Sequence, residues 1–368
     1  MIYLDNNATT QPDANAMATA FNDTIKFYGN PSSTHKAGER AKEMIDEARS
    51  WIAKSINAKP EEIVFTSGGT EANALALNGK HRYRICSKLE HSSMYEWADY
   101  IVRANKDGTV NLENLEFYVK EDRPIEGRQM VAIGLVNNET GVIQPVQAVA
   151  ELGRKYGHQV HIDAVAAYGK IPIDVQKLDC DTLSISAHKI HGPKGVGALY
   201  VREGTKIEPL MRGGAHERGL RPGTENIFGI VAFGEVVMYR FHDDYGDPKD
   251  WMDGETHQEM RDEFERLLAD VSAVNGTTDR VWNVSNLFFP KVKDVDLFLH
   301  LLSEEGVCAS GQSACSSGMC APSRVLTAMY GGGSPEVMGS VRFSFASITG
   351  MEEMKQAAEI IKKVLAQL

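Results

Sequence analysis

Apolar strands alternate with helical patterns between residue 14 and about residue 245, and this alternation limits the possible folds more than any other feature of the chain. Short apolar segments at 62–65, 130–136 and 182–185 are separated by stretches with helical periodicity. Such alternation predicts an α/β fold, with a mostly parallel sheet covered by helices on both faces. Ligands in these folds bind beyond the carboxyl ends of the strands, so the residues that follow each strand are the first candidates for a site.

The last third of the chain predicts a second, smaller unit. The stretch 240–256 is polar and rich in Asp and Gly, as expected at a domain boundary. The pattern after it predicts helices and strands in an α+β arrangement: helices at 255–270, 295–302 and from 350, and strands at 284–289 and 341–345. We therefore expect a large domain over 14–245 and a small domain formed by 1–13 and 246–368.

A lysine and an aspartate follow two of the predicted strands. Lys189 comes directly after the strand at 182–185, and Asp163 ends the strand at 159–163. An amine at this place can form a Schiff base with an aldehyde, and a carboxylate can keep a ring nitrogen protonated, which together are what pyridoxal phosphate needs. Each residue alone is better explained as a surface lysine or a helix-capping aspartate. Only the pair, together with the motifs below, predicts the cofactor.

Two segments offer donors for a phosphate group. The run 66–71, Thr-Ser-Gly-Gly-Thr-Glu, follows a strand and opens a predicted helix, whose free amides could bind phosphate together with the hydroxyl of Thr70. A capped helix with a glycine turn explains the same run. Ser186 and His188, beside Lys189, supply a second set of donors.

Three more residues follow or interrupt strands in ways that suit a ligand site. His91 could stack on a flat ring and move protons, although a surface histidine is the plain alternative. Asn138 could bond a carboxylate or a phenolic oxygen, although two adjacent asparagines also form an ordinary turn. Arg342 stands within an apolar strand, where a guanidinium suits bidentate binding of an α-carboxylate or simply reaches solvent.

Three of the five cysteines are close together, at Cys308, Cys315 and Cys320. The neighbours of Cys315 are small or flexible, which favours a reactive thiol on an exposed loop over a packed, structural thiol. A metal site is a second interpretation, but the segment has no CxxC pair and no nearby histidine, and we expect no metal. A redox switch between Cys315 and Cys320 is a third.

Charge, the length of apolar runs and the cysteine count argue against several classes of protein. The formal net charge of −11 argues against direct nucleic-acid binding. No apolar run reaches the ~18 residues of a membrane span, and the N-terminus has no basic stretch followed by an apolar one, so we expect neither a membrane segment nor a signal peptide. The odd number of cysteines does not fit a secreted disulfide framework, which favours a cytoplasmic protein.

Taken together, these motifs resemble the cysteine desulfurases, a group within the class V aminotransferases and the fold-type I pyridoxal phosphate enzymes. The resemblance runs over essentially the whole chain and rests on 3–10, 66–71, 90–91, 136–141, 161–164, 186–195, 221–226, 313–315 and 342–344. The run 313–315, Ser-Ala-Cys, is similar to the group with a long cysteine loop, which supplies sulfur for iron–sulfur assembly and thiolation. It implies a large, mostly parallel sheet domain and a smaller α+β domain.

The resemblance also implies an activity and the residues that carry it. The enzyme removes sulfur from L-cysteine, releases L-alanine, and holds the sulfur as a persulfide on Cys315 for a sulfur-acceptor protein. Lys189 holds the cofactor's aldehyde and moves protons. His91 stacks on the ring, and Asp163 pairs with the ring nitrogen. Asn138 and Arg342 orient the substrate carboxylate. The phosphate is bound by Gly69, Thr70, Ser186 and His188. Thr224 is expected to reach the phosphate bound by a partner subunit, which implies a homodimer.

The chain departs from the family pattern at Ala166. The family commonly has glutamine there, three residues after the ring-nitrogen aspartate, and alanine cannot bond the cofactor's phenolic oxygen. From the resemblance we expect the C-terminal extension that docks some relatives to a scaffold to be short or absent. Two alternatives stay open: selenocysteine lyase or another class V activity, and a weakly active sulfur-relay scaffold. The small, flexible neighbours of Cys315 argue against an aminotransferase, which needs no mobile thiol.

Overall fold

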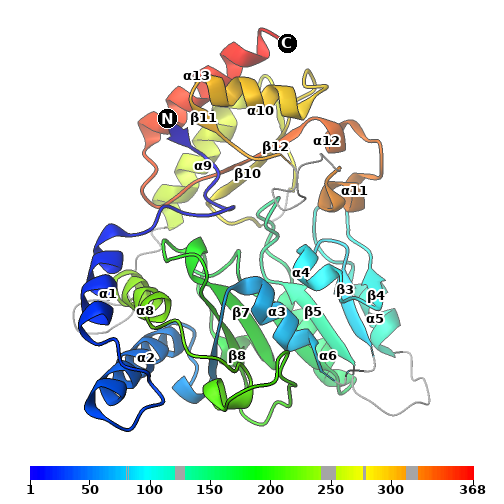
Figure 1. Ribbon diagram of the computed structural model, residues 1–368. Helices are drawn as coiled ribbons and strands as arrows, with labels where there is room; N and C mark the ends of the chain where they lie inside the picture. Colours follow the sequence, from blue (N-terminus) through cyan, green and yellow to red (C-terminus); the bar gives the residue numbers. More distant parts are fainter. Residues whose placement is uncertain (80, 82, 121–128, 242–253, 277–278, 312–321) are drawn as a thin grey trace.

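The structure is a computed structural model of the 368-residue chain, and it describes every residue except 80, 82, 121–128, 242–253, 277–278 and 312–321. A seven-stranded sheet lies at the centre of the larger lobe (Figure 1). Its strands are β2 (Ile63–Thr66), β3 (Arg84–Ser87), β4 (Tyr100–Val102), β5 (Met130–Gly134), β6 (Gln159–Asp163), β7 (Thr182–Ser186) and β8 (Gly197–Val201).

The strands of this sheet follow the order β2-β8-β7-β6-β5-β3-β4. Strand β8 is antiparallel to both of its neighbours, and all the other pairs are parallel. The predicted mostly parallel sheet is therefore confirmed. The edge strand β4 was not expected from the sequence, because its three residues are too few to show an alternating pattern.

Alternating side chains of the strands enter two different cores. In β5, Val131 and Ile133 face the main core, whereas Met130 and Ala132 pack on the opposite face. The main core is covered by α1 (Ala14–Lys26), α2 (Lys36–Ser55), α5 (Leu112–Lys120), α6 (Val146–Lys155), α7 (Val175–Leu178) and α8 (Ile227–Phe241), and the other face by α3 (Gly69–Leu77) and α4 (Ser92–Tyr95). Burial on both faces explains why these strands are apolar throughout.

The smaller lobe has its own core around an antiparallel sheet of order β12-β10-β9. Its strands and helices are α9 (Gly254–Leu268), β9 (Ala273–Val274), β10 (Val284–Phe288), α10 (Val295–Glu304), β11 (Val307–Cys308), α11 (Arg324–Tyr330), α12 (Pro335–Met338), β12 (Ser340–Ser344) and α13 (Met351–Leu365). Helices α9, α10 and α13 and strands β10 and β12 lie within one to two residues of their predicted positions. The predicted domain limit near residue 245 falls outside the described residues.

The N-terminal segment joins the two lobes. Strand β1 (Ile2–Tyr3) pairs in parallel with β11, and Leu4 is buried in the core of the smaller lobe. A few residues later the backbone N–H of Thr10 donates to His188 O at 3.0 Å, in the larger lobe. The segment between these two points therefore runs past the carboxyl end of the central sheet.

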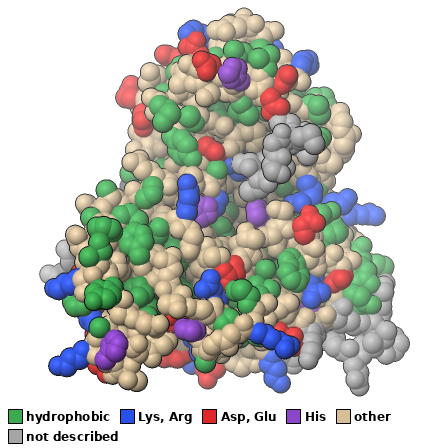
Figure 2. Space-filling model, viewed as in Figure 1, with side chains coloured by type: hydrophobic (Ala, Val, Ile, Leu, Met, Phe, Trp, Pro, Cys, Tyr) green, Lys and Arg blue, Asp and Glu red, His purple; other side chains and the backbone are tan. Residues whose placement is uncertain are grey.

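Charged side chains are distributed over both lobes. On the face in Figure 2, acidic and basic side chains are interspersed, and both chain termini belong to the smaller lobe at the top of Figure 1. Within the part of the chain that the structure describes, no helix combines the length and the apolar character needed to cross a membrane.

Candidate active site

Lys189 lies directly beyond the carboxyl end of β7, in the short 3-10 helix η2 (Ala187–Lys189). Its Nζ donates to the backbone oxygens of Asn7 at 2.6 Å and Ala8 at 2.9 Å, so the N-terminal segment holds the amine. The backbone oxygen of Lys189 accepts a hydrogen bond from Lys170 Nζ at 2.9 Å. Burial, aided by the nearby charges of Arg240 and Lys189, lowers the pKa of Lys170 to about 7.

Asp163 ends β6, the strand next to β7, and is buried with 8% of its surface exposed. Its Oδ1 accepts the backbone N–H of Val165 at 2.9 Å. Its Oδ2 accepts a hydrogen bond from Asn73 Nδ2 at 2.7 Å. The structure thus places the predicted aspartate and lysine at neighbouring strand ends, with the carboxylate fixed from two sides.

His91 caps the N-terminus of α4, after β3. The backbone N–H of Ser93 donates to His91 Nδ1 at 3.1 Å, and Ser93 Oγ lies 2.7 Å from the same nitrogen. Ser93 Oγ also accepts a hydrogen bond from Asn73 Nδ2 at 2.8 Å. His91 and Asp163 are therefore connected through Asn73, a residue that the sequence did not single out.

The backbone at the start of α3 approaches β8 and the segment after β6 closely. A Cβ on Gly69 would lie 2.6 Å from Val165 Cγ2, and a Cβ on Gly197 would lie 2.8 Å from the Gly68 Cα. Both glycines are therefore needed for close packing. They bring the free amides of the first turn of α3, including that of the exposed Thr70, beside Ser186.

Ser186 Oγ is buried and has no hydrogen-bond partner among the described residues. A buried hydroxyl without a partner is rare, and it fits a site for an acceptor such as phosphate. His188, two residues later, has Nδ1 3.2 Å from Thr9 Oγ1. Burial, followed by the charge of Lys189, lowers the pKa of His188 to about 4, which leaves it as a neutral imidazole at neutral pH.

Arg342 reaches the same region from β12 of the smaller lobe. It is buried, with 4% of its surface exposed, and donates from Nη1 to Asn138 O at 3.1 Å and from Nη2 to Asp5 Oδ1 at 2.8 Å. Its Nε has no hydrogen-bond partner among the described residues. Asn7 Nδ2 also donates to Asn138 O, at 2.6 Å, so Lys189, Asn7, Asn138 and Arg342 form one connected group.

Two buried carboxyl groups lie near these connected residues, and the sequence did not indicate them as site residues. Burial raises the pKa of Glu90 to about 7, although it accepts hydrogen bonds from Ser87 Oγ and Gly134 N, each at 2.6 Å. Burial also raises the pKa of Glu139 to about 7, and Ser323 Oγ donates to it. Each glutamate is adjacent in sequence to a predicted site residue, His91 or Asn138, which is the signal that could have identified it.

Some expected residues cannot be placed in this arrangement. Cys315 and Cys320 lie outside the described residues, whereas Cys308 is a half-buried free thiol in β11. Thr224 is exposed in the segment before α8, and its reach to a partner subunit stays a prediction. Over the described ranges, no group of three His, Cys, Asp or Glu residues is arranged to hold a metal ion.

Comparison with known proteins gives full-length matches. The aminotransferase class-V family matches residues 2–356. The cysteine desulfurase IscS of Dictyoglomus turgidum is 36% identical over 392 aligned residues, covering 100% of this chain and 95% of that protein. A NifS-like protein from Rickettsia africae has a TM-score of 0.88 at 29% identity, with 99% of each chain covered.

SspA, solved in complex with cysteine, has a TM-score of 0.78 at 28% identity, covering 94% of this chain and 99% of SspA. These similarities extend over both lobes, so they include the strand ends and the N-terminal segment that form the candidate site. The chain therefore belongs to the aminotransferase class-V family, a family of pyridoxal phosphate-dependent enzymes that includes the cysteine desulfurases.

Proposed function

We propose that this protein is a pyridoxal phosphate-dependent L-cysteine desulfurase. Its net reaction transfers the sulfur atom of L-cysteine to the thiol of Cys315, giving L-alanine and a persulfide. The Cβ–Sγ bond of the substrate breaks, a sulfur–sulfur bond to Cys315 forms, and the substrate carbon takes up a proton, so no external oxidant or reductant is needed. The relationship to cysteine desulfurases over the full chain supports this activity.

The observation that carries the proposal is the convergence at the carboxyl ends of β6 and β7. Lys189 offers an amine, Asp163 offers a fixed carboxylate, and Ser186 offers a buried hydroxyl without a partner among the described residues. These groups fit pyridoxal phosphate: Lys189 would hold the aldehyde, Asp163 the ring nitrogen, and Ser186 the phosphate. When bound, the cofactor acts as an electron sink for the carbanion-like species that forms as sulfur leaves.

The other groups have consistent roles in this proposal. Gly69 and Thr70, at the start of α3, would donate to the phosphate together with His188, and His91 would cover the ring. Thr224 would reach the phosphate of a partner subunit, so the active unit would be a homodimer. Lys189 would also carry a proton on Nζ to and from the substrate carbon, which is a common role for a lysine at such a site.

The substrate carboxylate would bind at Arg342. The guanidinium is buried, fixed by Asp5 and by the backbone oxygen of Asn138, and its Nε has no partner among the described residues. A planar guanidinium with such donors suits a carboxylate. The side chain of Asn138 would contribute from the opposite lobe. The related structure of SspA with cysteine supports an amino-acid substrate of this kind.

The persulfide would pass to a sulfur-acceptor protein of iron–sulfur cluster assembly or thiolation, in the cytoplasm. The similarity to IscS supports this class of acceptor. The identity of the acceptor depends on a surface beside Cys315, which lies outside the described residues.

The direct test is incubation of purified protein, loaded with pyridoxal phosphate, with L-cysteine. We expect L-alanine and a persulfide that peptide mass spectrometry locates on Cys315. Cys315→Ser should keep the cofactor band and lose the persulfide, whereas the matched control Cys308→Ser should keep both. A persulfide that depends on Cys320 instead would contradict the assigned nucleophile. Turnover of L-selenocysteine without turnover of L-cysteine would favour a selenocysteine lyase.

A further inference from the structure

Asn73 is a buried amide at the centre of the candidate site. It lies within α3, four residues after Gly69, and only 1% of its surface is exposed. Its Nδ2 donates to Asp163 Oδ2 at 2.7 Å and to Ser93 Oγ at 2.8 Å, and its Oδ1 lies 3.0 Å from His161 Nε2. Asparagine is a poorer helix former than alanine, so the local helix gains nothing from it. Its hydrogen bonds are the better explanation for its presence.

The orientation of this amide is fixed by its neighbours. The carboxylate of Asp163 only accepts hydrogen bonds, so the NH₂ group must face it, and the amide oxygen must face His161. His161 therefore carries its proton on Nε2, and its Nδ1 accepts from Thr182 Oγ1 at 2.9 Å. Burial lowers the pKa of His161 to about 3, which is consistent with a neutral ring that has one proton.

The direction of the hydrogen bonds continues from Asn73 to His91. The backbone N–H of Ser93 makes His91 Nδ1 an acceptor, so Ser93 Oγ, which accepts from Asn73, donates its own proton to that nitrogen, 2.7 Å away. The backbone N–H of Ser93 points at the same nitrogen, at 3.1 Å. Two donors at Nδ1 leave no room for a proton there, so the neutral His91 carries its proton on Nε2.

We propose that Asn73 is a positioning residue that links the two sides of the cofactor site: it holds the Asp163 carboxylate as a fixed acceptor and orients the Ser93 hydroxyl that donates to His91 Nδ1. This inference rests on the proposed function, because Asp163 and His91 would hold the ring of pyridoxal phosphate. The helix that carries Asn73 also begins at the phosphate-binding turn. One rigid element thus sets the phosphate position, the ring-nitrogen partner and the histidine.

The test uses Asn73→Ala with Asn78→Ala as its matched control. Asn78 ends the same helix, and its Nδ2 donates to the backbone oxygens of Glu208 and Pro209, far in sequence from the site. Both variants remove one amide that anchors α3. Only the first removes the hydrogen bonds to Asp163 and Ser93.

Two readouts other than turnover are measured on the full-length protein. The first is the dissociation constant of pyridoxal phosphate, obtained by absorbance titration of the cofactor-free protein. The second is the pair of imidazole ¹⁵N shifts of His91, assigned with His91→Asn. We expect Asn73→Ala to weaken cofactor binding roughly tenfold and to move the Nδ1 shift of His91, because the Ser93 hydroxyl that donates to this nitrogen loses the amide that orients it. Asn78→Ala should change neither readout.

Two further variants separate the hydrogen bond to Asp163 from the hydrogen bonds that lead through Ser93 to His91. Asn73→Leu keeps the approximate size of the side chain but has no hydrogen-bonding group, so it should reproduce both effects even where Asn73→Ala folds poorly. Ser93→Ala removes only the branch to His91, so it should move the His91 shifts and leave cofactor affinity within about threefold.

Wild-type values for both readouts in folded Asn73→Ala and Asn73→Leu would overturn the inference while leaving the desulfurase activity in place. Failure of the wild-type protein to bind pyridoxal phosphate would overturn the proposed function instead. The ¹⁵N shifts of the cofactor-free protein would then still decide whether Asn73 orients the Ser93 hydroxyl toward His91 Nδ1.

Discussion

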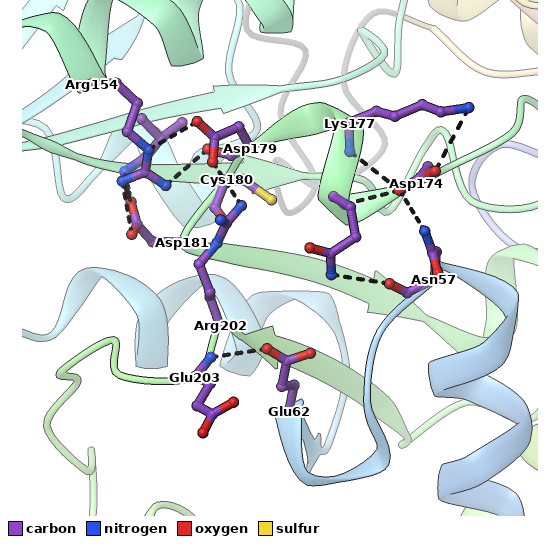
Figure 3. A network of polar contacts seen from close by, with 12 residues as sticks. Asn57, Glu62, Arg154, Asp174, Lys177, Asp179, Cys180, Asp181, Arg202 and Glu203 are labelled. Carbon is purple, nitrogen blue, oxygen red and sulfur yellow. Dashed lines mark hydrogen bonds and ion pairs between the residues drawn. The ribbon is translucent and has the colours of Figure 1, made fainter.

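Both ends of the seven-stranded sheet carry charged side chains, but the two ends use them differently. At the amino ends of β6 and β7, Arg154 donates to both oxygens of Asp181 at 3.0 Å and to Asp179 Oδ2 at 3.2 Å (Figure 3). Asp181 also accepts the backbone N–H of Val160 at 2.7 Å, and Arg202 pairs with Asp179 at 2.9 Å. These charges are paired with one another within the protein, although Arg202 Nη2 is not oriented to donate a hydrogen bond to a described residue.

The carboxyl ends of the same strands are arranged for a ligand. Ser186 Oγ, and Arg342 Nε in the adjoining lobe, have no hydrogen-bond partner among the described residues. Glu90 and Glu139 are buried deeply enough that burial raises the pKa of each to about 7. Buried polar atoms without hydrogen-bond partners lower the stability of the folded protein unless a bound ligand supplies the partners.

Unpaired atoms alone do not distinguish the two ends. Tyr200 Oη and Gln129 Oε1, near the amino ends of the strands, also lack a partner among the described residues. The difference is in their surroundings, since Ser186 lies at the same strand end as Lys189 and beside the first turn of α3. A functional site is therefore recognised by unpaired hydrogen-bond donors at the same strand ends as a reactive amine, and not by the number of charged side chains.

The largest expected effect follows a change at the carboxyl end. Lys189→Ala removes the amine that would hold the cofactor, so we expect the visible cofactor band to disappear and alanine formation to fall at least about a thousandfold. The exposed Lys194 in the same segment is the control, and Lys194→Ala should keep both. Unfolding temperatures of the cofactor-free proteins should agree. A normal cofactor band in Lys189→Ala would contradict the interpretation that the carboxyl end of the sheet is arranged for a ligand.

The second-largest effect is expected at the amino ends of β6 and β7, where a substitution should change the stability of the protein but not its binding of the cofactor. Asp181→Asn weakens the hydrogen bonds from Arg154 and Val160, so the free energy of unfolding in urea should fall by about 2–3 kcal/mol. In the nearby pair, the exposed Lys177 lies 3.7 Å from the half-buried Asp174, so Lys177→Ala should cost less than about 0.5 kcal/mol. Cofactor affinity should be unchanged in both. A loss of cofactor binding in Asp181→Asn would mean that this end also shapes the site.

A moderate effect is expected at Arg342. Lysine keeps the positive charge but cannot bind a carboxylate through two parallel N–H groups, so Arg342→Lys should raise the KM for L-cysteine about 10- to 100-fold. Asp5→Asn keeps an acceptor for Nη2 and serves as the control, with KM expected to stay within a few fold. An unchanged KM in Arg342→Lys would place the substrate carboxylate elsewhere.

The smallest effect is expected at Ala166, a half-buried residue in the turn after Asp163. A glutamine there could bond the phenolic oxygen of the cofactor, and one neutral hydrogen bond contributes roughly 0.5–1.5 kcal/mol. Because one pKa unit corresponds to about 1.36 kcal/mol, Ala166→Gln should shift the pH titration of the visible band by at most about one unit. An identical titration curve would show that this position does not contact the cofactor.

The sequence predicted the residues at strand ends better than the residues that hold them. Lys189, Asp163 and His91 follow apolar strands, and strand periodicity places them at one edge of the sheet. Asn73 lies inside a helix, and only the packing of α3 on the sheet shows that its amide reaches Asp163. The local pattern of a helix does not show which buried polar side chain faces which strand.

The N-terminal segment illustrates the same limit. The run 3–10 contributes to the family resemblance, but the sequence does not show that Asn7 and Ala8 hold the amine of Lys189 or that Asp5 pairs with Arg342. These contacts join residues more than 180 positions apart in sequence. They depend on the crossing of the segment between the two lobes, which no local pattern predicts.

The most direct test of the central claim is chemical trapping of the cofactor. The protein is loaded with pyridoxal phosphate, reduced with borohydride, digested, and analysed by peptide mass spectrometry. We predict that the cofactor is attached to Lys189, at the carboxyl end of the sheet. Attachment to the buried Lys170 or to any other lysine, or no attachment at all, would contradict the assignment of this end as the catalytic site.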